Sequence, residues 1–286
     1  MDLSLTEEQT EVVRRAQAAV SSGDAPTVPR SLTDAVLTAR EVGRATASTA
    51  FHHHLLADLV GWRGSGTVAV SLDATEGCAE FVAHADNADT LLISVGPDRV
   101  GVFTPGACRL VRQQAIDGPR WRVLFRPDDA VEVLPCDIAG ATARAAIVLA
   151  ADAVGAAEAA LDAAVAHVRS REQFGAPLAA LQVVQHRCAD MLLDVSVARD
   201  AVFDAAGTAD RGEPEKSVRL MAAFAKATVV ERCRRVTASA HQLAGGRGID
   251  ASAPYHRWYR RVKAAEPALG SSRAHRELIA AALLGP

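Results

Sequence analysis

The segment Arg171-Glu172-Gln173-Phe174-Gly175-Ala176-Pro177-Leu178 combines side chains that can hold a polar ligand. Arg171 supplies a cation, the glutamine an amide that donates and accepts hydrogen bonds, and the phenylalanine an aromatic wall. Gly175 tolerates backbone angles that other residues avoid, and Pro177 suits the first turn of a new helix. The segment is therefore interpreted either as a ligand-binding turn or as a helix–helix turn with a solvated arginine.

A second segment of this kind is His241-Gln242-Leu243-Ala244-Gly245-Gly246-Arg247-Gly248. Its three glycines lie within four positions, so the backbone can approach a ligand closely and turn its amides toward an anion. A helix C-cap is the other interpretation, although one glycine would be enough for that purpose.

Apolar helical patterns lead into and out of both segments. One runs from Ala146 to Val168 and ends before the first segment. The pattern that follows predicts one buried helix face made of Leu181, Val184, Cys188, Met191, Leu192 and Val195. The pattern before the second segment is built on Val218, Met221, Ala225, Val229 and Val236. From Ala139 onward the sequence is rich in Ala, which predicts an antiparallel bundle of four long helices. A short last helix is expected over 271–284, with Ser271 or Ser272 as its N-cap.

The first half of the chain changes character at residue 61. Residues 1–20 predict a helix capped by Ser4 or Thr6, and residues 32–60 predict a second helical region. Short β-prone runs separated by turn residues then predict a small barrel or sandwich. These runs are residues 67–72, 91–95, 100–104, 121–125 and 130–134. The expected fold is α+β and multidomain: a short N-terminal helical region over 1–60, a β-domain over 61–138 and a helical bundle over 139–286.

The amino-acid composition indicates which partners and which cellular location to expect. The 286 residues carry a formal net charge of −3 with no block of one sign, which argues against nucleic acid or an anionic membrane as the main partner. Five scattered cysteines without a Cys-x-x-Cys pair predict reduced thiols and a cytoplasmic location. The acidic N-terminus lacks a signal-peptide core, and we expect no apolar run long enough to span a bilayer.

Both segments, together with residues 174–191, resemble the C-terminal half of the flavin-dependent acyl-CoA dehydrogenases. In that family the Arg-x-Gln-Phe-Gly turn and the Gln-x-x-Gly-Gly loop grip FAD that is bound mainly by a neighbouring subunit. The likeness is dense from about Ala146 to the C-terminus and weaker before it. The resemblance implies FAD as cofactor, an acyl-CoA substrate, an oligomer, and an electron-transfer flavoprotein as electron acceptor.

The resemblance also implies which residues meet the cofactor. Arg171 would hold the pyrophosphate through paired, charge-assisted hydrogen bonds, and the glycine-rich loop would meet the adenine end. The expected FAD contacts are Arg171, Gln173, Phe174, Gln182, Gln242, Gly245 and Gly246. For Arg171 the other interpretation is a salt bridge to Glu172 or to a helix end.

The catalytic base of the family has no clear counterpart. Dehydrogenation of an acyl-CoA needs a carboxylate that takes the α-proton. Leu269 occupies the position at which the family usually has a Glu, and no carboxylate lies near Ala145, the position used by a minority. Glu266 is the nearest substitute, but Pro267 places it at a helix end, and a salt-bridged surface Glu is the favoured interpretation. The loop that contacts the flavin ring is also missing, because residues 73–77 are at best a remnant of it.

Two further clusters favour ordinary roles. His52, His53 and His54 are consecutive, so on a helix they point in different directions and cannot converge on one metal ion. We expect them on a helix surface and predict no metal site. A basic cluster, made of Arg257, Arg260, Arg261 and Lys263, either meets CoA phosphates or covers a helix terminus, which is the simpler interpretation.

Three functions follow as hypotheses. The first is a subunit of a heteromeric, FAD-dependent acyl-CoA dehydrogenase, which lacks its own base and lends its motifs to the flavin of a second acyl-CoA dehydrogenase-like chain. Short chains of this kind resemble one half of the heterotetrameric enzymes that dehydrogenate steroid side-chain CoA thioesters. The shortened N-terminal region indicates either a wider acyl pocket or a pocket that another chain completes. The second is a complete homo-oligomeric enzyme with a displaced base such as Glu266. The third is the family fold reused without flavin, as a scaffold or for another reaction.

Overall fold

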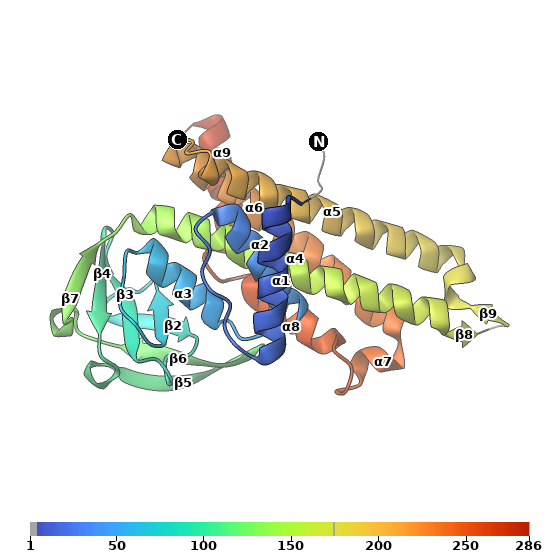
Figure 1. The fold of residues 1–286 in the computed structure, drawn as a ribbon, viewed down its shortest axis with the longest axis horizontal. Coiled ribbons are helices and arrows are strands. Elements are labelled where there is room, and N and C mark those ends of the chain that lie inside the picture. Colours follow the sequence, from blue (N-terminus) through green and yellow to red (C-terminus); the bar gives the residue numbers. More distant parts are fainter. Residues whose placement is uncertain (1–4, 174, 286) are drawn as a thin grey trace.

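The chain runs from helices through strands to a long helical bundle (Figure 1). A computed structural model describes residues 5–173 and 175–285. In Figure 1 the strands β1 to β7 gather at one end of the molecule, and the bundle extends to the other. The division into domains at residues 60 and 138 stays a prediction.

The N-terminal part contains three helices. Their bounds are α1 Glu7–Ser22, α2 Leu32–Arg44 and α3 Ala50–Leu59. Thr6 caps α1 as expected, because its hydroxyl accepts from the backbone N–H of Gln9 while the Gln9 side chain accepts from Thr6 N–H. The predicted helical region over 32–60 is two helices, since the chain turns at Thr46, whose φ is 49°.

The strands form two open sheets that share one core. The bounds are β1 Val68–Ser71, β2 Cys78–Val82, β3 Thr90–Gly96, β4 Arg99–Phe103, β5 Arg109–Ala115, β6 Gly118–Leu124 and β7 Glu132–Pro135. One sheet has the order β1-β3-β4-β7, with β1 parallel to β3, and the other has the order β2-β6-β5. Leu91 and Phe103 of the first sheet pack with Ala79 and Val123 of the second. The predicted sandwich is therefore confirmed, whereas the barrel alternative is wrong.

Two strands lacked a clear sequence signal. Strand β2 is short and shifts register between Ala79 and Val82, and β5 carries charged and amide side chains along a half-exposed surface. Neither pattern shows the continuous apolar run that marked β3 and β4, both of which are largely buried.

The bundle is built on α4 Ile138–Ser170, α5 Gln182–Asp210 and α6 Glu215–Ala244. Shorter helices follow, with the bounds α7 Gly246–Ile249, α8 Tyr255–Ala265 and α9 Ser272–Leu284. The described residues thus hold three long helices, and the expected number of four was wrong, because the chain breaks at Gly245 and Glu266. Ser271 caps α9 as predicted, by accepting from the N–H of Ala274.

Helices α2 and α4 touch at their backbones. A Cβ atom on Gly43 would lie 1.9 Å from the carbonyl oxygen of Asp152, and one on Gly155 would lie 1.9 Å from that of Arg40. Only glycine fits at either position, since real Cβ contacts are never so short. This pair of close contacts fixes the N-terminal helices on the central helix of the bundle.

Helix α4 corrects one expectation about membranes. By length and composition it could cross a bilayer, although we expected no apolar run of that length. Within the protein, however, 78% of its most apolar window is buried, and the core helix of a soluble protein passes the same test. Among the described residues it is the single helix that meets these criteria.

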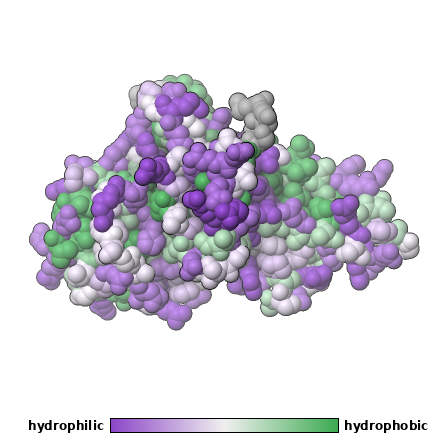
Figure 2. All heavy atoms as spheres, in the orientation of Figure 1, coloured by the Kyte–Doolittle hydropathy of each residue, from purple (hydrophilic) through white to green (hydrophobic). Residues whose placement is uncertain are grey.

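Helix α5 is less buried than its sequence indicated. Met191 and Val195 face the core as predicted, but Leu181 and Leu192 are exposed, which corrects the expected buried face. Figure 2 shows apolar surface gathered over α5, on the right of the view. The exposed apolar side chains of this helix and its N-cap are Leu181, Val183, Leu192, Leu193 and Val197.

Candidate functional site

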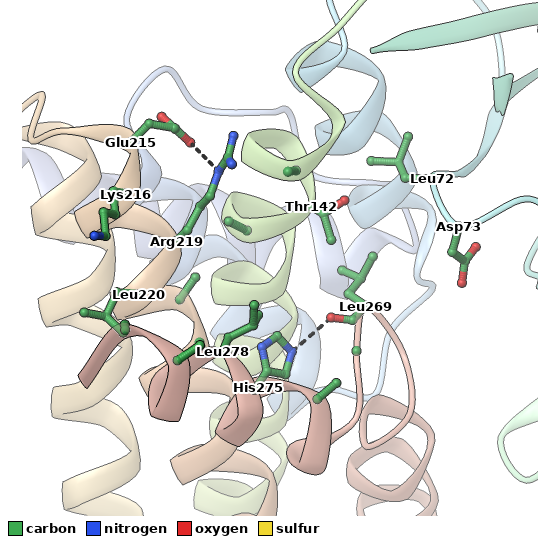
Figure 3. Close-up of a pocket in the computed structure, with 18 residues that line it drawn as sticks. Leu72, Asp73, Thr142, Glu215, Lys216, Arg219, Leu220, Leu269, His275 and Leu278 are labelled. Atoms are coloured by element: carbon green, nitrogen blue, oxygen red, sulfur yellow. Dashed lines mark hydrogen bonds and ion pairs between the residues drawn. The ribbon is translucent and has the colours of Figure 1, made fainter. Parts of the chain in front are cut away.

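The largest apolar cavity that we describe lies where the bundle meets the β sheets. It has a volume of 750 Å³, within the range of small-molecule sites. Figure 3 shows its labelled side chains, which come from the connection after β1, from α4, from α6, from the connection between α8 and α9, and from α9. Those used below are Leu72, Asp73, Thr142, Glu215, Leu269 and His275.

Leu269 lines this cavity and has a left-handed backbone, with a φ of 56°. Its carbonyl oxygen accepts a hydrogen bond from Nε2 of His275 at 3.0 Å, which is drawn in Figure 3. Leu269 also packs against the core that α3 and β1 share. The position at which the sequence led us to expect a base is therefore an aliphatic side chain in the cavity wall.

Two buried basic side chains hold the loop around Leu269. Lys226 of α6 places Nζ 2.6 Å from the carbonyl oxygen of Ala265, and burial lowers its pKa to about 8. Burial also lowers the pKa of His275, and the charge of Lys226 acts in the same direction. The neutral imidazole can then donate to Leu269 through Nε2. Neither side chain was identified as part of a site by sequence reasoning.

Two carboxylates line the cavity, and both lie at its edges. Asp73 is exposed and accepts a hydrogen bond from Ser71 Oγ at 2.8 Å. Glu215 forms an ion pair with Arg144, with distances of 2.7 and 3.0 Å. Figure 3 places Asp73 and Glu215 on opposite sides of Leu269. The sequence signal for Asp73 was its place in the remnant of the flavin loop, whereas Glu215 had none.

Glu266 does not line this cavity. It caps the C-terminus of α8, and its Oε2 lies 2.5 Å from Nζ of Lys263. This is the salt-bridged arrangement that the sequence favoured. Ala145, the other position at which the sequence led us to look for a base, is buried in the core between the helices and the first sheet.

The Arg171 segment forms the turn at the far end of the bundle. Arg171 caps α4, and its carbonyl accepts from the N–H of Leu178 at 2.8 Å. Strands β8 Glu172–Gln173 and β9 Ala176–Pro177 then make a short hairpin, seen at the tip of the bundle in Figure 1. The side chains of Arg171, Gln173 and Gln182 are all exposed. Phe174, the predicted aromatic wall, lies outside the described residues.

The glycine-rich loop lies at the same end of the bundle. Burial lowers the pKa of His167, and the positive charges of Arg247 and Arg171 lower it further. Both arginines therefore lie near this histidine. Gly245 and Gly246 are exposed, and a Cβ atom on either would meet nothing within 4 Å. Gln242 lines a groove of 900 Å³ between α5 and α6. The tertiary structure thus brings the two motifs together around an open surface that can accept a large anionic ligand.

The three histidines are not a helix surface, which corrects our expectation. His53 is buried, and its Nδ1 accepts a hydrogen bond from the N–H of Val70 at 3.0 Å. His52 places Nε2 2.8 Å from Oδ2 of Asp152. Both reach groups on other elements because α3 lies between the sheet and α4. Within the described ranges, no group of three or more His, Cys, Asp and Glu side chains could hold a metal ion.

Comparison with known proteins gives matches to a family model, to a curated relative and to solved structures. The sequence model of the acyl-CoA dehydrogenase C-terminal domain matches residues 138–284, just over half of the chain. FadE25 of Mycobacterium tuberculosis, described as a probable acyl-CoA dehydrogenase, is 38% identical over 134 residues. That match covers 47% of this chain and 34% of the relative, so it spans about a third of the relative's length.

Solved structures with the same fold match over nearly the whole chain. A chain of the ChsE4–ChsE5 complex from Mycobacterium tuberculosis has 19% identity and a TM-score of 0.85, with 100% of both chains covered. A chain of the Tcur3481–Tcur3483 steroid ACAD has 20% identity and a TM-score of 0.86, with 97% and 98% covered. At these identities the likeness shows the fold alone.

Proposed function

The chain belongs to the acyl-CoA dehydrogenase family, and from this membership we propose that it is a subunit of an FAD-dependent acyl-CoA dehydrogenase that works with a catalytic partner chain. The reaction would be α,β-dehydrogenation of an acyl-CoA thioester, with a bulky or steroid-derived acyl group. Its electrons would pass to an electron-transfer flavoprotein. The scattered free cysteines support a reduced, cytoplasmic location.

One observation carries the proposal: Leu269 lies in the wall of the 750 Å³ cavity. A base must be within hydrogen-bond reach of the proton that it removes, and leucine cannot accept a proton. Glu266, the nearest carboxylate in sequence, is held by Lys263 and does not line the cavity. A chain that binds a thioester here would therefore depend on another chain for the chemical step.

The residues at the far end of the bundle fit FAD. The exposed Arg171 would hold the pyrophosphate, and Gln242 with the open Gly245–Gly246 backbone would meet the adenine end. Gln173, Phe174 and Gln182 complete the proposed set. FAD supplies the hydride acceptor of the dehydrogenation when it is bound. Arg171, Gln242 and the Gly245–Gly246 backbone are exposed, so they suit a flavin that a neighbouring subunit holds.

The partner is proposed to be a second acyl-CoA dehydrogenase-like chain. The exposed apolar side chains on α5, such as Leu192 and Leu193, would be covered by such a subunit. Two of the structures with this fold are described as a ChsE4–ChsE5 complex and as a Tcur3481–Tcur3483 steroid ACAD. The bulky acyl group is proposed because no described residue of α1, α2 or α3 lines the cavity.

A complete homo-oligomeric enzyme is the second candidate, and one observation favours it. Asp73 and Glu215 line the cavity, so a displaced carboxylate base is available without a partner. Asp73 is the better placed of the two, because Glu215 is already paired with Arg144. In this candidate Glu266 plays no part.

The two candidates separate on purification. The chain is purified alone and after co-expression with a dehydrogenase-like chain encoded beside it, and mass, FAD content and acyl-CoA oxidation are measured. We expect stable FAD and turnover only for the pair. A homo-oligomer of this chain alone, with one FAD per subunit and normal acyl-CoA oxidation, would contradict the proposal.

A further inference from the structure

A second, polar cavity of 520 Å³ lies on a different part of the molecule. Its walls come from the α2–α3 connection, the connection after β2, the β5–β6 hairpin and α8. It shares no lining residue with the cavity around Leu269. Whatever it binds is therefore separate from the proposed acyl-CoA site.

Four arginines and two aspartates line this cavity, so its wall is positively charged. Two of the arginines are already paired: Arg261 with the buried Asp152, and Arg120 with Asp117. The other two, Arg257 and Arg260, are exposed on α8, and neither forms an ion pair within residues 5–173 and 175–285. Two guanidinium groups at the rim are thus available for an anion.

Two buried polar atoms in the wall are unsatisfied. Oδ1 of Asp117 and Nδ1 of His256 have no hydrogen-bond partner among the described residues. Buried polar groups are nearly always paired, since an unpaired one costs free energy. A carboxylate oxygen can only accept, so the missing partner of Asp117 is a donor such as a hydroxyl group.

The backbone around the cavity is also strained. Thr46 and His84 have φ values of 49° and 58°, and they are two of five non-glycine residues with positive φ in the described chain. A β-branched residue such as threonine is rarely found there. Side chains that line the cavity hold both strained segments in place. Thr49 Oγ1 lies 2.7 Å from His84 Nε2, and Arg261 Nη1 donates a hydrogen bond to the carbonyl oxygen of Ala47 at 2.7 Å. Strain held in this way gathers at binding sites.

We propose that this cavity binds a small phosphate monoester that also carries hydroxyl groups. The phosphate would lie between Arg257 and Arg260, whose planar guanidinium groups match its oxygens. A hydroxyl group would donate to Oδ1 of Asp117. The volume suits a ligand of this size. The site rests on none of the residues used for the proposed dehydrogenase function.

Calorimetric titration of the full chain with ribose 5-phosphate, inorganic phosphate and ribose tests the site. We expect ribose 5-phosphate to bind one per chain and more tightly than the other two. Arg260→Gln should weaken this binding about tenfold or more, the loss expected for a charged hydrogen bond. The matched control is Arg63→Gln, because Arg63 is an exposed arginine outside this cavity. The affinity of this control variant for ribose 5-phosphate should be unchanged.

A second variant tests the hydroxyl contact separately. In Asp117→Asn the amide oxygen would stay toward Arg120, so an NH2 donor replaces the acceptor Oδ1 that the hydroxyl group would meet. The binding of ribose 5-phosphate should therefore weaken, whereas that of inorganic phosphate should not, because the wall loses a negative charge. Thermal unfolding of each variant shows that the fold is intact. Equal affinities of Arg260→Gln and Arg63→Gln, or no tighter binding of ribose 5-phosphate than of ribose, would overturn the proposal.

Discussion

Arg261 grips Asp152 with two parallel hydrogen bonds, Nε to Oδ1 at 2.7 Å and Nη2 to Oδ2 at 2.6 Å. The pair joins α8 to α4, and His52 of α3 completes it. Burial is the largest single influence on the pKa of Asp152 and would raise it, but the charge and hydrogen bonds of Arg261, together with those of His52, outweigh burial, and the pKa is lowered. Three elements from distant parts of the sequence thus meet at one buried carboxylate.

Removing this carboxylate should destabilise the fold strongly. Asp152→Asn leaves Arg261 buried without a counter-charge, so we expect the free energy of unfolding to fall by about 3–5 kcal/mol. Urea denaturation monitored by circular dichroism measures the change. Asp162→Asn is the control, because Asp162 is exposed and pairs with Arg44 at the surface. Its cost should stay below about 1 kcal/mol, and similar losses in both variants would contradict the prediction.

Stability should fall with acid before any carboxylate titrates. Burial, followed by the charges of nearby His84 and His52, lowers the pKa of His53 to about 3. In the native state its Nδ1 accepts a hydrogen bond from the N–H of Val70. The unfolded chain binds this proton near pH 6.5, so between about pH 6.5 and 3 it binds more protons than the native state, and stability rises with pH. We expect a loss of about 2 kcal/mol between pH 7 and 5.

Substitution identifies the histidine that is responsible. His53→Gln keeps an acceptor for the Val70 N–H but does not titrate, so the part of the loss that His53 causes, about 2 kcal/mol between pH 7 and 5, should disappear. His54→Gln on the same helix is the control and should keep it. If stability falls between pH 7 and 5 by as much in His53→Gln as in the unsubstituted chain, another group is responsible for that loss.

Arg171 should govern flavin retention. Arg171→Ala removes a charged hydrogen bond, which typically contributes about 1.5–3 kcal/mol, so the FAD content of the purified assembly should fall. The absorbance ratio of flavin to protein measures this content. Arg169→Ala is a close control, because Arg169 is also exposed at the end of α4. Equal FAD content in the two variants would reject the proposed role.

Glu266 should not act as the base. In the active assembly Glu266→Gln should keep most of the turnover, since its carboxylate is held by Lys263 outside the cavity. Asp73→Asn should also keep it if the partner chain supplies the base. Steady-state acyl-CoA oxidation separates the outcomes. A drop of several orders of magnitude in Asp73→Asn alone would favour the complete homo-oligomeric enzyme instead.

The sequence by itself determined the order of the parts and the two motif segments. Glycine and proline mark chain reversals through their own backbone preferences, so the turn at Gly175 and the break at Gly245 could be predicted locally. The cap at Ser271 is also local, because its hydroxyl accepts from the N–H of Ala274, three residues further along the chain. The expectation that Leu269 stands where a base would be also came from the sequence, because residue type alone decides whether a side chain can take a proton.

Only the tertiary structure decided which distant residues share a surface. His53 looked like part of a helix surface, yet it is buried because α3 lies against β1, and Asp152 gave no sign of its partners on α3 and α8. Likewise, residues as far apart in sequence as Thr46 and Arg261 meet at the polar cavity only because α8 packs beside the α2–α3 connection and the β5–β6 hairpin. Local patterns report whether a face is apolar, whereas contacts between elements far apart in sequence depend on how those elements pack.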